Sequence, residues 1–303
     1  MATRFDGKTF GAAKLAALDD QVAQFQERVG RVPTILSIFP YEDTASVLYT
    51  KLKRQDAQSV GMKYATQPLS MKEDIDVWMR AVQEANANPK VDGLIVQKPA
   101  RGEFLKVTGK SKEQYYSWWS AIVESIDVSK DVDGLSPHTL LELARLSDRV
   151  NRGTDQPHDS LDAVVLPATA QAIIDVALEA VNNDVETLRQ KKVVLLGTSV
   201  IVGRPATYGF WMLGVEAEMH GSNADPAEVL PSADIVVSAT GQTDLISPKW
   251  IKDGAILLDV GAPKAEFQAA CYEKASFYTP VPGGIGPVTR ACLLENVLKK
   301  KEW

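Results

Sequence analysis

The sequence predicts an α/β protein with two domains, each built on a parallel sheet. Short apolar runs alternate with amphipathic helical stretches, a pattern typical of parallel strands connected by helices. At 303 residues the chain is long enough for two domains that each bury a core. A polar segment over residues 151–160, which holds Gly, Pro and Asp, lies near the expected boundary. We therefore expect a first domain at 1–150 and a second at 151–285.

The first half is expected to contain three helices and two strands. Leu18, Val22 and Phe25 recur at a helical period, which predicts one helix ended by the glycine that follows it. In order, the expected elements are a helix over Ala12–Val29, a strand over Thr34–Phe39, a helix from a cap at Asp43 or Thr44 to Gly61, a helix over Asp74–Asn86 and a strand over Gly93–Gln97.

The second half is expected to contain one helix followed by four strands. Each strand is a short apolar run that ends in small or polar residues. The helix is expected over Thr169–Val181, and the strands over Lys192–Leu196, Val215–Met219, Ile235–Ser238 and Ala255–Asp259.

Composition excludes several classes of protein. The net charge of -6 argues against nucleic acid or a membrane surface as a partner, because both select basic faces. No apolar run approaches the roughly 18 residues that span a bilayer, and the first residues show no signal-peptide segment. Cys271 and Cys292 fit neither a disulfide framework nor a zinc site, and no metal is predicted. We expect a cytoplasmic protein.

A glycine turn follows the first strand of the second half. The segment Gly197-Thr-Ser-Val-Ile-Val-Gly203-Arg-Pro205 has the glycines that let backbone N–H groups approach a pyrophosphate, with Pro205 suited to the first turn of a helix. It lacks the middle glycine of the usual fingerprint, so a plain strand-to-helix turn is the alternative. Small residues at two more strand ends, Ser238–Gly241 and Asp259–Gly261, favour a dinucleotide lying across the sheet.

The residues that follow the strand expected over Val215–Met219 indicate which dinucleotide binds. An acid that would hold the adenine ribose is expected there, but the chain has His220-Gly-Ser-Asn and no acid before Asp225. The missing acid leaves room for a 2′-phosphate, which favours NADP over NAD. His220 itself could equally be a surface histidine.

Polar side chains in the first half form a candidate catalytic group. Tyr49 and Lys53 lie four residues apart in an expected helix and share a face, at the edge of an apolar stripe with Leu48 and Leu52. The alternative is a lysine that covers a half-buried ring. Gln97 ends a buried strand, so its amide is expected to point out of the strand tip.

Two loops complete the candidate residues. Lys130-Asp-Val-Asp-Gly-Leu135 places two carboxylates, one of them Asp133, in a turn with too few ligands for calcium. Thr279-Pro-Val-Pro-Gly-Gly-Ile-Gly-Pro287 is stiffened by proline, and its glycines allow close approach to a flat ligand. An interdomain connector is the alternative for this second loop.

In this order, the segments resemble the bifunctional methylenetetrahydrofolate dehydrogenase/methenyltetrahydrofolate cyclohydrolase family. The resemblance covers nearly the whole chain. The matching residues are Asp6-Gly-Lys8, Ala45-Ser46-x-x-Tyr49-x-x-x-Lys53, Gly93-x-x-Val-Gln97-x-Pro99, Lys130-Asp-Val-Asp-Gly134, Gly197-x-Ser199-x-x-Val-Gly-x-Pro205, Ala239-Thr-Gly241, Asp259-Val-Gly261 and Pro280-Val-Pro-Gly-Gly-x-Gly-Pro287.

The resemblance implies a three-layer α/β catalytic domain, a Rossmann-like domain and a cleft between them. It also implies a last helix over 286–303 that packs on the first domain, and a homodimer. The implied chemistry is oxidation of 5,10-methylenetetrahydrofolate with NADP+ (NAD+ being possible) to the methenyl cation, and hydrolysis of that cation to 10-formyltetrahydrofolate. These reactions belong to one-carbon metabolism, which serves purine and amino-acid biosynthesis.

The resemblance also implies roles for single residues. Lys53 would transfer protons in hydrolysis, Gln97 would hold Lys53 by a hydrogen bond, Tyr49 would orient the substrate rings and Asp133 would bind the pterin. Residues implied at the folate are Tyr49, Lys53, Val96, Gln97, Lys98, Asp133, Pro282, Gly283, Gly284, Ile285 and Gly286. Residues implied at the cofactor are Gly197, Thr198, Ser199, Val202, Gly203, Arg204, Pro205, Ser222, Ala239, Thr240, Gly241, Gly261 and Ala262.

The chain departs from the family pattern mainly on the cofactor side. Thr198 stands where many members carry arginine, Ala262 stands where isoleucine is usual, and the stretch 261–276 is short and lacks a Gly-Asp-Val segment. On the folate side, Lys98 replaces an apolar residue. Two alternatives therefore stay open: a cyclohydrolase with a weakened or NAD-preferring dehydrogenase, and a folate- or nucleotide-binding protein without turnover.

Overall fold

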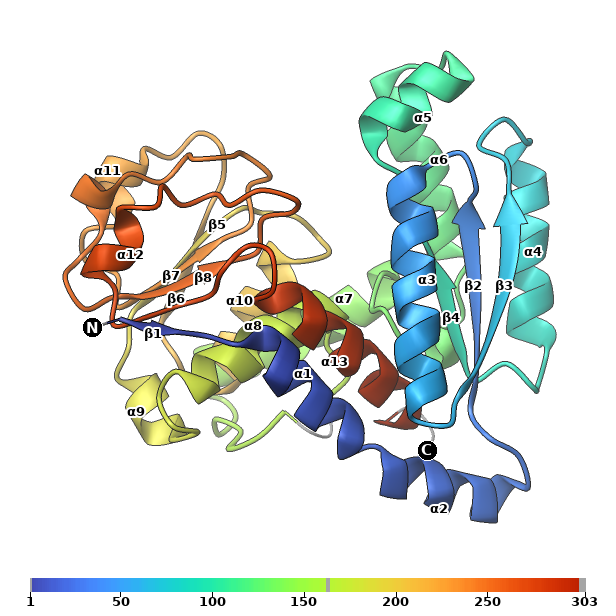
Figure 1. Cartoon of the computed structure of the whole chain (residues 1–303), viewed down its shortest axis with the longest axis horizontal. Coiled ribbons are helices and arrows are strands. Elements are labelled where there is room, and N and C mark those ends of the chain that lie inside the picture. The colour runs from blue at the N-terminus through green and yellow to red at the C-terminus, as the bar shows by residue number, and fades with distance from the viewer. Residues whose placement is uncertain (1, 162–163, 300–303) are drawn as a thin grey trace. The chain divides into compact units, whose positions relative to one another are not determined.

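The protein contains two parallel sheets, one of three strands and one of six (Figure 1). The computed structural model describes residues 2–161 and 164–299. Residues 162–163 of the expected second domain and 300–303 of the expected last helix lie outside this range. The described residues divide into a small-sheet unit, residues 15–139 and 293–299, and a large-sheet unit, residues 2–14, 140–161 and 164–292.

The small-sheet unit is built on three parallel strands in the order β3-β2-β4. Helix α3 lies on one face of this sheet and α4 on the other (Figure 1). The strands are β2 (Thr34–Pro40), β3 (Lys63–Leu69) and β4 (Gly93–Val96). The helices are α2 (Asp19–Val29), α3 (Thr44–Ser59), α4 (Ile75–Ala87), α5 (Arg101–Thr108) and α6 (Lys112–Glu124), with a short 3-10 turn over Val128–Lys130.

The two faces of the small sheet differ in chemistry because successive strand residues point to opposite sides. Ile38 of β2 and Val96 of β4 face an apolar core that includes Trp78 and Trp118. On the opposite face, toward α3, β2 carries the polar residue Ser37, and Tyr64 of β3 stands beside Ile35 of β2. The sheet therefore packs one face against an apolar core, and its other face buries polar groups.

The large-sheet unit is a parallel sheet in the order β1-β9-β8-β7-β5-β6. Its strands are β1 (Thr3–Arg4), β5 (Val193–Leu196), β6 (Ala217–His220), β7 (Ile235–Ser238), β8 (Ile256–Asp259) and β9 (Phe277–Tyr278). Its helices, three of which (α1, α7 and α13) include residues of the other unit, are α1 (Gly7–Ala16), α7 (Pro137–Asn151), α8 (Ala168–Glu179), α9 (Val185–Arg189), α10 (Gly203–Met212), α11 (Pro226–Val229), α12 (Cys271–Lys274) and α13 (Ile285–Lys299), with a 3-10 turn over Pro248–Trp250.

The two-domain α/β class with parallel sheets is confirmed, but several elements differ from expectation. The single helix expected over Ala12–Val29 is two helices, because the chain turns at Leu18, whose N–H bonds back to the Leu15 carbonyl at 2.9 Å. Strand β3 was not expected, since its Lys-Tyr-Ala-Thr-Gln-Pro-Leu sequence is mostly polar. Pairing of β1 with β9 joins residues 1–14 to the large-sheet unit, whereas the sequence placed them in a domain over 1–150.

Two of the composition arguments can be compared with the structure. None of the helices in residues 2–161 and 164–299 is both long and apolar enough to cross a bilayer. Cys271 and Cys292 are both free thiols and both buried.

Candidate active site

Helix α3 carries Tyr49 and Lys53 and is fixed at its first turn. The Asp43 carboxylate accepts hydrogen bonds from the backbone N–H of Ser46 at 3.0 Å and from its hydroxyl at 2.5 Å, which caps the helix. Lys53 is only 8 % exposed, whereas Tyr49 is 42 % exposed and reaches solvent. The expected apolar stripe is wrong in part: Leu48 is 54 % exposed, so it does not face the core.

The real buried face of α3 runs through polar positions. Its buried residues are Ser46, Thr50, Lys53 and Ala57. Lysine is almost never fully buried without a partner, because its ammonium loses hydration. The position of Lys53 at the centre of this face therefore points to a specific partner.

That partner is Asp133, which ends a short segment, residues 131–133, that packs against β4. Asp131 bridges Leu94 of β4, and a Cβ on Gly93 would lie 2.9 Å from the side chain of Val132, so only glycine allows this approach without a shift. The Asp133 Oδ2 atom lies 3.4 Å from Lys53 Nζ, and the two side chains are 21 % and 10 % exposed.

The two other charged residues of this segment have structural roles. Asp131 is fully buried and accepts from the backbone N–H groups of Leu135 and Ser136, each at 2.9 Å, and from the Thr139 hydroxyl at 2.8 Å. Lys130 donates to two carbonyls at the end of α4. Only Asp133 of the acidic turn is thus directed to Lys53.

Gln97 follows β4 directly, as expected, and its N–H donates to the Ile38 carbonyl at 2.9 Å. Its amide Nε2 is buried and has no hydrogen-bond partner among the described residues. The Lys53 ammonium could donate only to the Gln97 amide oxygen, and within the part of the chain described Lys53 Nζ bonds to Asp133 instead. A buried amide without a partner is costly, which makes it available to a ligand or to water.

The neighbours of Gln97 differ in environment. Val96 is buried in the apolar core, so its side chain does not face a ligand. Lys98 Nζ lies 5.4 Å from the centre of the Trp119 ring and 6.0 Å from that of Tyr115, a cation–π arrangement. Burial lowers the pKa of Lys98 below its usual value, and the Tyr116 hydroxyl opposes this effect.

In the large-sheet unit, the glycine turn after β5 is packed so tightly that it tolerates no side chain at two positions. Gly197 has φ +119°, and a Cβ there would lie 2.3 Å from the Ala239 carbonyl oxygen. A Cβ on Gly203 would lie 1.9 Å from the Gly197 carbonyl oxygen. The turn then enters α10 at Gly203, with Pro205 in the first turn as expected.

The rest of this turn is open to solvent. Thr198, Ser199 and Arg204 are exposed, and Val202 is half-buried. The Ser199 hydroxyl accepts from the Val202 N–H at 3.1 Å, which orders the start of the helix. A rigid turn with exposed backbone at the amino end of a helix suits a phosphate group.

The turn after β7 is held by a residue that the sequence analysis missed. Glu266 is 2 % exposed and accepts from the Thr240 N–H at 2.8 Å and the Gly241 N–H at 2.7 Å, as well as from the Thr240 hydroxyl at 2.7 Å. Its own N–H bonds to the Asp259 carboxylate at 2.9 Å. No pattern in the short stretch after Gly261 marks this glutamate.

Asp259 organises the third strand end. Burial raises its pKa, although the N–H groups of Gly261, Glu266 and Phe267 oppose that shift. Gly261 is half-buried and Ala262 exposed. Both predicted residues thus lie at the carboxyl edge of β8.

These strand ends fit a dinucleotide. β5 has β6 on one side and β7 on the other, so the chain changes direction across the sheet between β5 and β7, where ligands of open α/β sheets bind. The turns at Gly197 and Ala239 meet there, and Ser222 lies exposed after β6. Glycines at Gly197 and Gly203, where a Cβ would clash, together with an exposed turn, provide the close backbone approach that a pyrophosphate requires.

The proline-glycine loop is also in the large-sheet unit. Gly283 has φ +102°, and a Cβ on Gly284 would lie 2.6 Å from the Pro280 carbonyl oxygen. Pro282 and Gly286 are exposed, while Ile285 is buried and begins α13.

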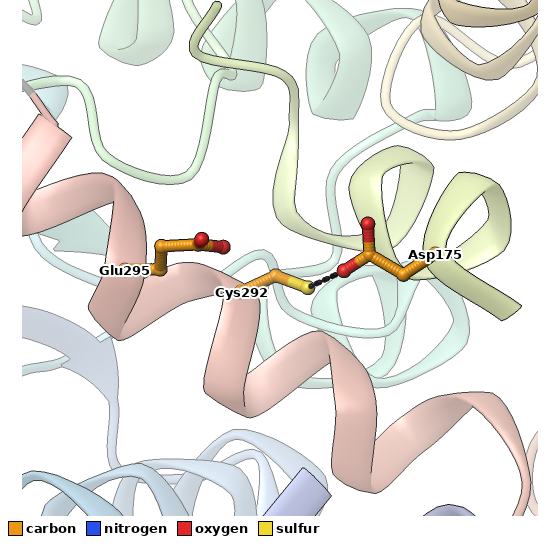
Figure 2. A group of neighbouring side chains, drawn as sticks. All are labelled: Asp175, Cys292 and Glu295. Carbon is orange, nitrogen blue, oxygen red and sulfur yellow. Dashed lines mark hydrogen bonds between the residues drawn. The ribbon is translucent and has the colours of Figure 1, made fainter. Parts of the chain in front are cut away.

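A separate group with acidic members, Asp175 of α8 with Cys292 and Glu295 of α13, is drawn in Figure 2. The Cys292 thiol donates to Asp175 Oδ2 at 3.4 Å, and Glu295 follows one turn later on α13. Asp175 also pairs with Lys14 Nζ at 3.0 Å and accepts from Gln171 at 2.6 Å. Both oxygens of Asp175 are thus already engaged, and we assign this group no ligand.

Two family models match the chain, one in each half. The model for the tetrahydrofolate dehydrogenase/cyclohydrolase catalytic domain matches residues 5–133. The model for the NAD(P)-binding domain of the same family matches residues 167–303. Together these two matches cover most of the chain.

Solved structures are similar over almost the full length. The bifunctional methylenetetrahydrofolate dehydrogenase/cyclohydrolase of Campylobacter jejuni is 27% identical with a TM-score of 0.81, covering 100% of this chain and 99% of its own. The enzyme of Trypanosoma brucei, solved with NADP and an inhibitor, is 26% identical with a TM-score of 0.80, covering 99% and 97%. The NAD-dependent dehydrogenase of Saccharomyces cerevisiae, at 20% identity and a TM-score of 0.74, covers 99% and 96% and shares the fold.

Proposed function

The chain belongs to the tetrahydrofolate dehydrogenase/cyclohydrolase family, and from this premise we propose how its own residues carry the two reactions of one-carbon folate chemistry. The first reaction oxidises 5,10-methylenetetrahydrofolate to the methenyl cation. The second hydrolyses that cation to 10-formyltetrahydrofolate. The contact between the buried Lys53 and the half-buried Asp133 is the observation that carries this assignment.

Hydrolysis requires a group that moves protons near neutral pH. Water adds to the one-carbon bridge and loses one proton. The bond from that carbon to one nitrogen then breaks as the C=O forms, the hydroxyl proton passes to the leaving nitrogen, and the formyl group stays on the other nitrogen. Lys53 is the amine available for this transfer, since Asp133 holds it and water has little access to it. Asp133 remains reachable enough to accept hydrogen bonds from the amino and ring N–H groups of a pterin. Tyr49, exposed one turn away, offers a ring for the flat substrate.

The oxidation step asks less of the protein. When bound, the nicotinamide supplies the hydride acceptor, and no protein acid or base is needed. The chain therefore has to bind and orient the dinucleotide. We assign this to the turn over Gly197–Pro205, the turn over Ala239–Gly241 that Glu266 holds, and the strand end at Gly261.

Purified protein given methylenetetrahydrofolate and NADP+ should produce NADPH absorbance, followed by 10-formyltetrahydrofolate. Hydrolysis of the methenyl compound without reduction of either NADP+ or NAD+ would instead support the alternative of a cyclohydrolase with a weakened dehydrogenase. Binding without either turnover would contradict the proposed function.

We propose NADP as the cofactor, and the end of β6 offers a test. Ser222 is exposed, so Ser222→Asp adds a charge without disturbing the core. A carboxylate there should repel a 2′-phosphate and bind a free ribose, raising the KM for NADP+ roughly tenfold or more relative to that for NAD+. Ser222→Asn, which is neutral and of the same shape, is the control. An equal effect of both variants on the two cofactors would contradict this assignment.

A further inference from the structure

The layer between α3 and the small sheet contains an unusual number of buried polar atoms without partners. Ser37 of β2 is fully buried, Thr50 of α3 is 3 % exposed, and Tyr64 of β3 is 8 % exposed. The side-chain oxygen of each lacks a hydrogen bond within the described residues, as does Gln97 Nε2 at the end of β4. Native proteins leave few buried polar groups unsatisfied, so several of them in one layer need an explanation.

The backbone places these groups on the same face as Lys53. Tyr64 stands beside Ile35 in the β2–β3 register, and Ser37 is two residues further along β2, so both side chains point to the face that α3 covers. Arg54, the residue after Lys53, donates to the hydroxyl of Thr66 on this face at 2.7 Å. The polar atoms therefore lie beneath the helix that carries the proposed proton-transfer group.

Tyr64 is also within the electrostatic reach of Asp133. Burial raises the pKa of the Tyr64 hydroxyl well above its usual value, the Asp133 charge raises it further, and the Ser37 hydroxyl and the Arg54 charge oppose the shift. The Ser37 and Tyr64 hydroxyls are thus polar neighbours, although their geometry falls short of a hydrogen bond. Two neighbouring hydroxyls supply two of the two to four polar partners that a buried water needs.

We propose that Tyr64 is a positioning residue for hydrolysis: its hydroxyl, with that of Ser37, binds a water molecule that orients the Asp133 carboxylate beside Lys53. Tyr64 does not touch the substrate in this account. It acts through Asp133, whose distance of 3.4 Å from Lys53 Nζ is long for a charged hydrogen bond and leaves room for such an adjustment. This inference rests on the proposed function of Lys53.

The test compares Tyr64→Phe and Ser37→Ala with the wild-type enzyme in both reactions. Each variant should lower the kcat of methenyl hydrolysis by roughly three- to tenfold, which is the contribution of one hydrogen bond. The kcat of the dehydrogenase should stay unchanged, because hydride transfer uses no proton-transfer group. Deleting a hydroxyl that has no protein partner should leave the melting temperature unchanged or raise it.

Tyr115→Phe is the matched control for stability. Tyr115 is equally buried, at 3 % exposure, but its hydroxyl donates to the Pro99 carbonyl at 2.9 Å, so its loss should lower the melting temperature. The inference is overturned if Tyr64→Phe and Ser37→Ala both hydrolyse the methenyl compound at the wild-type rate, or if they lose hydrolysis and dehydrogenase activity equally. Absence of hydrolysis in the wild-type protein would refute the proposed function instead.

Discussion

Lys53→Met should reduce the rate of methenyl hydrolysis by about 10²–10⁴-fold, the range that one positioned acid–base group contributes. Methionine keeps the length and apolar stem of the side chain and removes only the ammonium. The dehydrogenase rate should fall far less, because the hydride moves without a protein proton donor. Loss of the methenyl absorbance measures hydrolysis, and formation of NADPH from methylenetetrahydrofolate and NADP+ measures the dehydrogenase.

Lys51→Met is the control for this variant. Lys51 lies on the same helix, two residues earlier, but its side chain is exposed, so its loss should leave hydrolysis unchanged. If Lys53→Met retained more than about a tenth of the wild-type hydrolysis, a group other than Lys53 would have to transfer the proton.

Gly203→Ala should weaken dinucleotide binding and slow the dehydrogenase by about 100-fold, the effect of displacing a binding group by about 1 Å. The added Cβ would lie 1.9 Å from the Gly197 carbonyl oxygen, which is backbone and cannot rotate away. The turn must therefore open where the pyrophosphate is expected. Hydrolysis should be kept, because Lys53 and Asp133 belong to the small-sheet unit. Cofactor titration by fluorescence, alongside both assays, measures this separation.

Gly102→Ala controls for the substitution itself. Gly102 also lies near the start of a helix, α5, and a Cβ there meets no atom within 4 Å. Alanine should be neutral or stabilising at that position, since it is the better helix former. Tight NADP+ binding by Gly203→Ala would show that the turn after β5 is not the pyrophosphate site.

Motifs in the sequence predicted the fold class and the family because both depend on local patterns. The strand end at Gln97 and the glycine turn at Gly197 follow apolar runs directly, so their place at a sheet edge can be inferred from the chain alone. Lys53 and Asp133 are 80 residues apart, and the resemblance implied a separate role for each at the folate, so their direct contact was not predicted. The homodimer and the cytoplasmic location stay predictions.

The features that the sequence missed depend on packing between distant segments. Tyr64 lies in β3, whose mostly polar sequence gives no strand signal, and its proposed role depends on packing against α3. Glu266 is one acid in an irregular loop, and only the fold brings its carboxylate to the N–H groups of Thr240 and Gly241. Leu48 was expected to face the core, but α3 packs on the partly polar face of the sheet and buries Thr50 and Lys53 instead.

A crystal structure of the protein with a stable analogue of methenyltetrahydrofolate tests the central claim most directly. We predict that the Asp133 carboxylate hydrogen-bonds to the pterin amino and ring N–H groups at about 3 Å, with Lys53 Nζ facing the one-carbon bridge. An analogue whose pterin does not contact Asp133, or whose one-carbon bridge does not face Lys53 Nζ, would contradict the roles proposed for these two residues.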